Sequence, residues 1–568
     1  MDAIMVLLLI LVPGLPLAWA LALVCRSWRS VFLRLAPWTV LPGMLAAMPF
    51  ADGTVLQVPW LLLGARLGLD PVGRVFLGVS AFSWLVAGIY AQRSLAMDPR
   101  RSRFFFFYLL TASGNLGIIV VQDLASFYLF FTLMSLAFYA LIIHDGTPGA
   151  RRAGRVYISL AIIGEALLYA GFTLLARRAG TLDLPAVAVP AGEAAFALLF
   201  LGFGIKAGSL PLHVWMPLVY RHAPIAAAVV SSGALINAGL LGWLRFLPLG
   251  QEAQPELGLL YLTAGLAAAF YGVMVGLTQT EPKSLLAYSS ISQMGLMTVP
   301  VGIGLAAPAA WPLALAAVLV YVVHHALAKG ALFLGVGLAA ANGGPDRRRL
   351  LSVGLLLPAL ALAGMPLTSG AIAKLALKQA AAAWPVSWIG WLELLLSLTA
   401  VGTTLLMVRF LFLFRAHPSG RTNLEKGLSM PWGISLAAVA AAPVLWPSLA
   451  VASLDPAKLW SAFWPVGLGA LIGGGAAALA GRTGTRMPVR IPAGDILLPV
   501  ERGGRSLVAA WAALAERRPA SFWPRALPAG LAGHDRWLRL EARLRQWFVA
   551  GLLFLAITAA LLLALPDP

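Results

Sequence analysis

Eight ionisable side chains lie within long apolar stretches of this 568-residue sequence, and their types could support proton transfer. A charged side chain in the hydrocarbon core of a bilayer costs at least about 2.5 kcal/mol, so such residues usually face a cavity or a partner. Burial disfavours the charged form of a lysine and a nearby carboxylate favours it, so a lysine that alternates between the two settings relays a proton. The candidates for a proton pathway are Glu165, Lys206, His324, His325, Lys329, Lys374, Lys378 and Glu393.

Spacing indicates which of these residues share a helix face. Lys206 lies in a run of Leu, Phe, Gly and Ile that is too far from either loop for its amine to reach water easily. His325 and Lys329 are four residues apart and therefore lie on one face of a helix. Imidazole is the group best matched to proton relay near neutral pH. His324 points about 100° away from His325, so at most one of the two histidines lines the same path easily.

The remaining candidates have alternative structural roles. Lys374 and Lys378 also share a helix face, but Lys378 is nearer to the membrane boundary, where it can serve as a snorkelling anchor. Glu393 can pair with a basic group in packing alone. Glu165 is the other carboxylate among the candidates.

Prolines predict that two apolar spans are interrupted in mid-membrane. The first span carries Pro211 and Pro217 shortly after Lys206, and the second carries Pro366 before Lys374. Proline removes an amide donor and clashes with the preceding turn. Broken backbone is tolerated at that depth only where protein or a wet cavity satisfies the freed groups. Two interrupted helices about five spans apart are typical of inverted repeats in transporters; the alternative is ordinary proline kinks in packed helices.

Composition shows that the bilayer is the main solvent of this chain. Hydrophobic residues make up 60% of the sequence, charged residues 11%, and the mean hydropathy is +0.86, which excludes a soluble fold. We expect an all-α polytopic membrane protein with about 14–16 transmembrane helices, each formed by a run of roughly 18 or more apolar residues. No basic region precedes the first run, so we expect a retained helix rather than a cleaved signal peptide.

Cysteine count and motif content exclude several classes of chemistry. A single cysteine, Cys25, cannot form an intramolecular disulfide or hold an iron–sulfur cluster, and no Cys/His spacing for zinc is present. The sequence also lacks a phosphate-binding Gly-Lys-Ser/Thr loop and a dinucleotide-binding glycine fingerprint. We therefore expect no metal site and no cofactor in this chain, and no catalytic residues.

Basic residues cluster in alternate loops, which indicates topology rather than nucleic-acid binding despite the formal charge of +19. Clusters occur at 26–34, 93–103, 151–155 and 347–349. The positive-inside rule then puts the odd-numbered loops in the cytoplasm and the N-terminus outside. The expected location is a bacterial inner (plasma) membrane.

Composition divides the chain into successive segments. Residues 1–100 supply N-terminal helices, 101–250 and 251–415 two halves of a bundle, and 416–480 further transmembrane helices. Residues 481–546 are rich in Arg, Pro and Trp and contain a basic amphipathic pattern at 536–547. This segment is expected on the cytoplasmic side, either as a surface helix held by lipid headgroups or as a strap for neighbouring subunits. Residues 547–568 form a final span.

Four sequence motifs carry a resemblance to a known family. They begin at Ile205-Lys-Ala-Gly-Ser-Leu-Pro-Leu-His-Val-Trp-Met-Pro, Thr280-Glu-Pro-Lys-Ser, His324-His-Ala-Leu-Ala-Lys-Gly and Ala363-Gly-Met-Pro-Leu-Thr-Ser-Gly. In this order, over roughly residues 100–415, they resemble the proton-antiporter-type subunits shared by respiratory complex I, group 4 membrane-bound hydrogenases and Mrp-type sodium/proton antiporters.

The resemblance implies two inverted five-helix repeats, at 101–250 and 251–415, each with one broken helix and linked by a hydrated chain of charged residues. Lys206 matches the family's lysine beside the first break. Lys329 and His325 match its connecting lysine and histidine, and Lys374 matches the outlet residue beside the second break.

Two positions depart from the family pattern. Thr132 stands where members usually place the glutamate that partners the first lysine, and Asn237 stands where many have lysine. A threonine can hold water but supplies no negative charge, so the usual ion-pair switch is lost or relocated. Glu165, on the next helix, is the candidate replacement.

The sequence favours a proton-translocating subunit of a multi-subunit energy-converting complex. The expected partners are other membrane subunits, the lipid bilayer and, in some of these complexes, a soluble catalytic module. Three alternatives stay open: sodium/proton exchange, an ion-coupled inorganic carbon (bicarbonate or CO2) uptake complex, and a structural subunit with a degenerate proton path. The shortage of carboxylates counts against sodium, which prefers oxygen ligands as other hard cations do. An autonomous enzyme is not indicated, because no nucleophile–base set is present.

Overall fold

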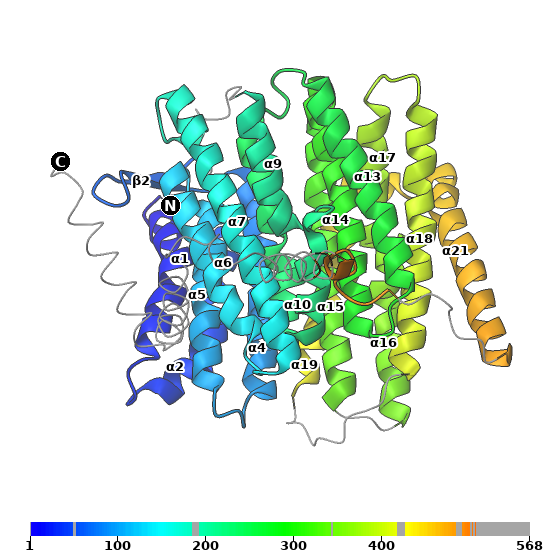
Figure 1. Ribbon diagram of the computed structural model, residues 1–568, viewed down its shortest axis with the longest axis horizontal. Coiled ribbons are helices and arrows are strands. Elements are labelled where there is room, and N and C mark those ends of the chain that lie inside the picture. Colours follow the sequence, from blue (N-terminus) through cyan, green and yellow to red (C-terminus); the bar gives the residue numbers. More distant parts are fainter. Residues whose placement is uncertain are drawn as a thin grey trace, which may run out of the picture. The chain divides into compact units, whose positions relative to one another are not determined.

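A computed structural model describes residues 2–48, 53–184, 192–341, 345–416, 427–483 and 491–499, with single positions 503 and 506. The chain divides into two compact units, Met1–Ile496 and Leu497–Pro568. Within the first unit, long helices run up and down the bundle, and from α5 to α18 they proceed broadly from one side of it to the other (Figure 1). Helices α4 and α19 depart from this order, because both pack against α15 in the middle of the bundle. The predicted amphipathic helix at 536–547 and the final span at 547–568 lie outside the described residues.

The N-terminal part combines membrane helices with one small hairpin. Its helices are α1 (Asp2–Ala22), α2 (Arg29–Leu35), α3 (Leu41–Ala46) and α4 (Pro71–Ser94). Strands β1 (Val55–Val58) and β2 (Ala65–Gly68) pair antiparallel, with Val55 opposite Gly68. Sequence patterning did not predict this hairpin, because its two strands are only four residues long and lie in a connection between spans.

The first repeat contains five spans, and the fourth is broken. Its elements are α5 (Arg101–Val120), α6 (Leu124–Ile142), α7 (Pro148–Ala179), the pair α9 (Glu193–Ala207) and α10 (Trp215–His222), and the pair α11 (Ile225–Val230) and α12 (Asn237–Phe246). Side chains cap the helix starts: Asp123 accepts a hydrogen bond from Ser126 N (2.7 Å) and Thr147 accepts one from Ala150 N (3.1 Å).

The second repeat has the same order, again with its fourth span broken. Its elements are α13 (Pro255–Leu277), α14 (Pro282–Ala306), α15 (Trp311–Ala341), the pair α16 (Pro345–Ala363) and α17 (Ser369–Ala382), and α18 (Ile389–Ala416). Helix α13 follows α5 by five spans, an odd number, so corresponding helices of the repeats run in opposite directions. This is the predicted pair of inverted five-helix repeats.

Glycines allow α13 and α14 to pack with their backbones in contact. A Cβ atom on Gly258, Gly265 or Gly272 would lie 2.6 Å from a backbone oxygen of α14, and the glycines recur every seven residues. Small residues at such spacing let membrane helices approach closely. The seam fixes the position of the polar side chains that α13 and α14 carry.

Helices α19 (Ser429–Ala441), α20 (Pro447–Ala452) and α21 (Pro456–Thr483) follow the second repeat. In the described part of the chain, eleven helices are long and apolar enough to cross a membrane. The predicted 14–16 spans include the one at 547–568, which lies outside the described residues. The remaining difference arises because α16 and α17 halve one span and α19 is short. Helix α14 is also more polar, since it carries Ser284, Ser289, Ser290, Ser292 and Gln293.

Candidate proton-transfer site

Each break begins at a glycine in the left-handed backbone conformation. A side chain donates a hydrogen bond to a carbonyl that the break leaves without its helical partner. After α9, Gly208 has φ +72, and the Trp215 Nε1–H donates to the carbonyl of Ile205 at 2.7 Å. After α16, Gly364 has φ +88, and the Lys374 amine donates to the carbonyl of Ala363 at 2.5 Å. A cation is favourable at a helix C-terminus, where the macrodipole is negative. The structure therefore supplies the partners that mid-membrane breaks require.

The three prolines predicted at the breaks lie in different places. Pro211 lies between α9 and α10, and Pro366 lies between α16 and α17. Pro217 is the third residue of α10, within the first turn, where the backbone amide has no intrahelical partner in any case.

Lys206 lies in the last turn of α9, with 5% of its surface exposed. Its amine donates to the Tyr157 hydroxyl at 3.1 Å and lies 5.4 Å from the centroids of the Phe131 and Tyr157 rings. Tyr157 in turn donates to the carbonyl of Ser135 at 3.0 Å. The hydroxyl and the two ring faces partly replace the water that an exposed ammonium would have.

Glu165 and Thr132 meet beside this lysine. The Thr132 hydroxyl donates to Glu165 Oε2 at 2.7 Å, and Glu165 is 7% exposed. Glu165 and Lys206 line one small cavity, together with Tyr157 and Trp215. Within the described residues the two charged groups make no direct ion pair. Asn237 is the other residue that departs from the family pattern. It begins α12 after a π-helical turn, and its side-chain amide donates to the carbonyl of Gly233 at 3.0 Å.

The middle of the bundle holds Lys329 and the two histidines on α15, all at most 1% exposed. The Lys329 amine donates to the carbonyl of Leu286 at 2.8 Å. His324 Nδ1 lies 2.9 Å from the Ser369 hydroxyl at the start of α17. Neither ring nitrogen of His325 has a hydrogen-bond partner among the described residues. Buried polar atoms are almost always paired, so both nitrogens of this imidazole are available to a further donor or acceptor.

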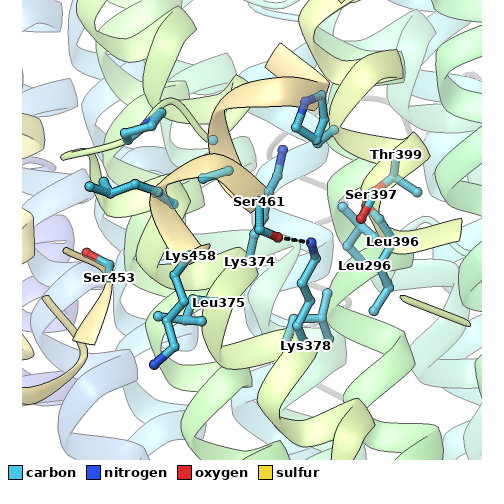
Figure 2. A pocket seen from close by; sticks show the side chains of 18 residues that line it. Leu296, Lys374, Leu375, Lys378, Leu396, Ser397, Thr399, Ser453, Lys458 and Ser461 are labelled. Atoms are coloured by element: carbon cyan, nitrogen blue, oxygen red, sulfur yellow. Dashed lines mark hydrogen bonds between the residues drawn. The ribbon is translucent and has the colours of Figure 1, made fainter. Parts of the chain in front are cut away.

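Lys374 and Lys378 line a cavity of about 60 Å³ between α17, α18 and α21, with Lys458 at its edge. Figure 2 shows the Lys378 amine turned toward Ser461, to which it donates at 2.8 Å. Lys378 is thus held by a neighbouring helix in addition to any snorkelling role. Glu393 lies exposed on α18 and forms no ion pair in the described part of the chain.

Sequence reasoning missed three groups that the structure places near this chain of residues. Tyr157 carries the hydrogen bond to Lys206, Arg245 donates to the last carbonyls of α5, and Asp495 contacts His213 inside the first break. His213 lies in the first of the four motifs, but nothing in the sequence indicated that a residue 282 positions later would reach it. Among the described residues, no three His, Cys, Asp or Glu side chains gather as a metal site would require.

Sequence comparison agrees with this arrangement. Residues 121–402, which include both breaks and every candidate side chain, match the family described as NADH:quinone oxidoreductase/Mrp antiporter, transmembrane region. The chain belongs to this family. The two inverted repeats and two broken helices that the resemblance implied are present in the structure.

Two curated relatives are similar to parts of this family member. Component B of hydrogenase-4 from Escherichia coli is 29% identical over 295 residues, which cover 49% of this chain and 44% of the relative. One of the Na⁺/H⁺ antiporter subunits from Alkalihalophilus pseudofirmus is 29% identical over 338 residues, which cover 56% of this chain and 67% of the relative. The chain therefore spans less than half the length of the hydrogenase relative.

A solved structure shows the same fold over almost the whole chain. The Mrp complex from Dietzia sp. DQ12-45-1b matches with a TM-score of 0.73 at 20% identity, covering 99% of this chain and 63% of the matched chain. At this identity the likeness concerns the fold alone.

Proposed function

We propose that this chain is an antiporter-like, proton-translocating membrane subunit of a multi-subunit energy-converting complex in a bacterial inner membrane. One observation carries the proposal: a series of buried basic side chains extends from the first broken span to the second. Lys206 stands at one end, His325 and Lys329 in the middle, and Lys374 at the other end. The proposal requires no cofactor in this chain.

In this mechanism the charge on one lysine controls the next. A proton that binds at Lys206 makes the ammonium, which Glu165 attracts and which repels a positive charge at Lys329. Removing that charge shifts the proton through His325 toward Lys374, which lines a cavity of about 60 Å³. The driving energy would come from partner subunits.

Glu165 takes the role of the carboxylate that Thr132 replaces in this proposal. Three features support it: the carboxylate is buried, it lines the cavity of Lys206, and its oxygen is held by the very threonine that replaces the usual glutamate. The pair of Thr132 and Glu165 would then position the negative charge on the neighbouring helix.

Proton pumping in sealed vesicles that contain the intact complex tests the proposal. We expect Lys206→Ala and Glu165→Gln to abolish pumping while the complex still assembles. A matched control is Gly474→Ala on α21, where an added Cβ meets no atom within 4 Å. Unchanged pumping in both charge variants would mean that this subunit is a scaffold and that another chain moves the ion.

Sodium/proton exchange is the second candidate, because one relative belongs to a protein named a Na⁺/H⁺ antiporter. The hydroxyl of Thr132 and the carboxylate of Glu165 supply oxygen atoms of the kind that a sodium ion prefers. Pumping measured with and without Na⁺ in the same vesicles separates the two candidates, since only exchange would require the ion. We also expect the N-terminus outside, which a labelled cysteine at position 2 or 3 would test in intact cells.

A further inference from the structure

A carboxylate from outside the transmembrane helices is buried against the first break. Asp495 belongs to the described stretch 491–499, and only 4% of its side chain is exposed. Its Oδ2 atom accepts hydrogen bonds from the hydroxyls of Tyr271 (2.7 Å) and Tyr288 (2.9 Å) and lies 3.2 Å from His213 Nε2. Three donors around one oxygen favour the ionised carboxylate.

His213 is the group that this carboxylate orients. It lies in a short 3₁₀ turn, Leu212–Val214, between α9 and α10, and its side chain has no exposed surface. With Nε2–H donating to Asp495, the neutral imidazole keeps an acceptor lone pair on Nδ1. Nδ1 has no hydrogen-bond partner among the described residues. A carboxylate that fixes one tautomer of a histidine and stabilises its protonated form is a recurring device of proton transfer.

The backbone around Asp495 is fastened to the bundle independently of the carboxylate. The Gln279 amide donates to the carbonyl of Ile491 at 2.8 Å. Gly494 has φ +90, and a Cβ there would lie 3.3 Å from Leu218 on α10. The two tyrosines come from α13 and α14, whose glycine seam holds them in place. The ring of His213 lies 5.1 Å from that of Tyr271, centroid to centroid.

The break places His213 and Lys206 close along the chain. Lys206 is in the last turn before the break and His213 is within it, seven residues later. Trp215, two residues beyond His213, lines the cavity of Lys206 and donates to the carbonyl of Ile205. His213 and Lys206 therefore belong to the same interrupted span, and Trp215 contacts the backbone beside Lys206.

We propose that Asp495 is a positioning residue for proton transfer at the first break, where it holds His213 with Nδ1 free to accept a proton. A proton that binds Nδ1 of His213 forms an imidazolium paired with Asp495. When the proton leaves, this Nδ1–H bond breaks and the Nε2–H bond stays intact. No other bond changes. Asp495 thereby acts on the ion path through His213 without carrying the proton itself. This inference rests on the proposed function.

The test compares variants that separate the carboxylate's charge from the fastening of its segment. Asp495→Asn keeps the shape and still accepts from the tyrosines but removes the charge. Gln279→Leu removes the other fastening and leaves the carboxylate intact. In vesicles with the intact complex, we expect Asp495→Asn to lower the pumping rate about a hundredfold, the lower end of what a positioned proton-transfer group contributes. We expect Asp495→Glu to restore much of the rate and Gln279→Leu to pump like the wild type.

Two results would overturn the inference: wild-type pumping in Asp495→Asn, or equal losses in Asp495→Asn and Gln279→Leu, which would show that the segment is only structural. If Asp495→Asn fails to assemble, His213→Gln replaces it as the test. The glutamine amide can still donate to Asp495 but cannot take up a proton. Wild-type pumping by His213→Gln would equally reject the inference. Failure of the proposed function looks different, because pumping would then be absent from the wild type or insensitive to Lys206→Ala.

Discussion

The sharpest structural prediction concerns Gly370 at the start of α17. A Cβ atom at this position would lie 1.7 Å from the carbonyl oxygen of Ala361 on α16, whereas real Cβ contacts below 3.0 Å essentially do not occur. In Gly370→Ala the two halves of the second broken span must therefore separate by about 1.3 Å. The neighbouring Ser369 would move with α17 and away from His324.

The cost has two parts. Overpacking a well-packed site costs about 1–3 kcal/mol. The bond between His324 Nδ1 and the Ser369 hydroxyl is 2.9 Å long, so a shift of this size takes it past hydrogen-bond range, at about 1 kcal/mol more. We expect Gly370→Ala to lose about 2–4 kcal/mol of stability and most of its pumping.

Thermal unfolding of the purified complex and pumping in vesicles measure the two effects. The control is Gly474→Ala, where the added Cβ meets nothing within 4 Å and helix propensity predicts a slight gain in stability. If Gly370→Ala unfolds at the same temperature as this control and pumps normally, α16 and α17 do not meet as described.

Three further predictions follow from other contacts. Thr132 donates directly to Glu165, so a carboxylate at position 132 would lie beside position 165. The double variant Thr132→Glu/Glu165→Gln should therefore regain the pumping that Glu165→Gln alone lacks. Equal pumping rates for the two variants would show that the carboxylate has not been relocated. Arg245→Met should cost about 3 kcal/mol in thermal unfolding, because Ile118, Ile119 and Val121 would lose their donor at the buried end of α5; a change within error would contradict this capping role. Asp98 and His144 lie in loops and contact each other. Burial would raise the pKa of Asp98, but hydrogen bonds from the Arg100 amide and His144 hold it below its usual value. Burial lowers the pKa of His144, although the nearby Asp98 opposes this shift. Both groups bind protons less readily in the folded chain, so acidification below pH 6.5 should lower the unfolding temperature of the wild type more than that of His144→Phe, and parallel curves would refute this.

Local sequence features predicted the parts of the fold that depend on local physics. Apolar runs predicted the membrane helices. Pro211 and Pro366 predicted the two breaks, because a proline in a helix interior removes a hydrogen bond and clashes with the preceding turn. The hairpin at 55–68 was missed because four-residue strands have little pattern of their own. The seven-residue glycine spacing on α13 could have predicted the seam with α14.

The groups around the candidate site were predictable only in part. The cost of buried charge singled out Lys206, Lys329 and Lys374 without reference to their neighbours. Tyr157 and Asp495 could not be found in this way, because a hydroxyl in an apolar helix costs little and Asp495 lies in a polar segment where a carboxylate needs no explanation. Their positions depend on how distant segments pack, which periodicity does not contain.

The most direct test of the central claim is to interrupt the path in its middle. Lys329→Met replaces a fully buried amine with an apolar side chain of similar length, a change that often leaves stability unaltered or raised. Proton pumping in sealed vesicles should then be abolished although the complex assembles and unfolds at the wild-type temperature or higher. Pumping at the wild-type rate in a stable Lys329→Met complex would contradict the account, because protons would then cross without the lysine that joins the two breaks.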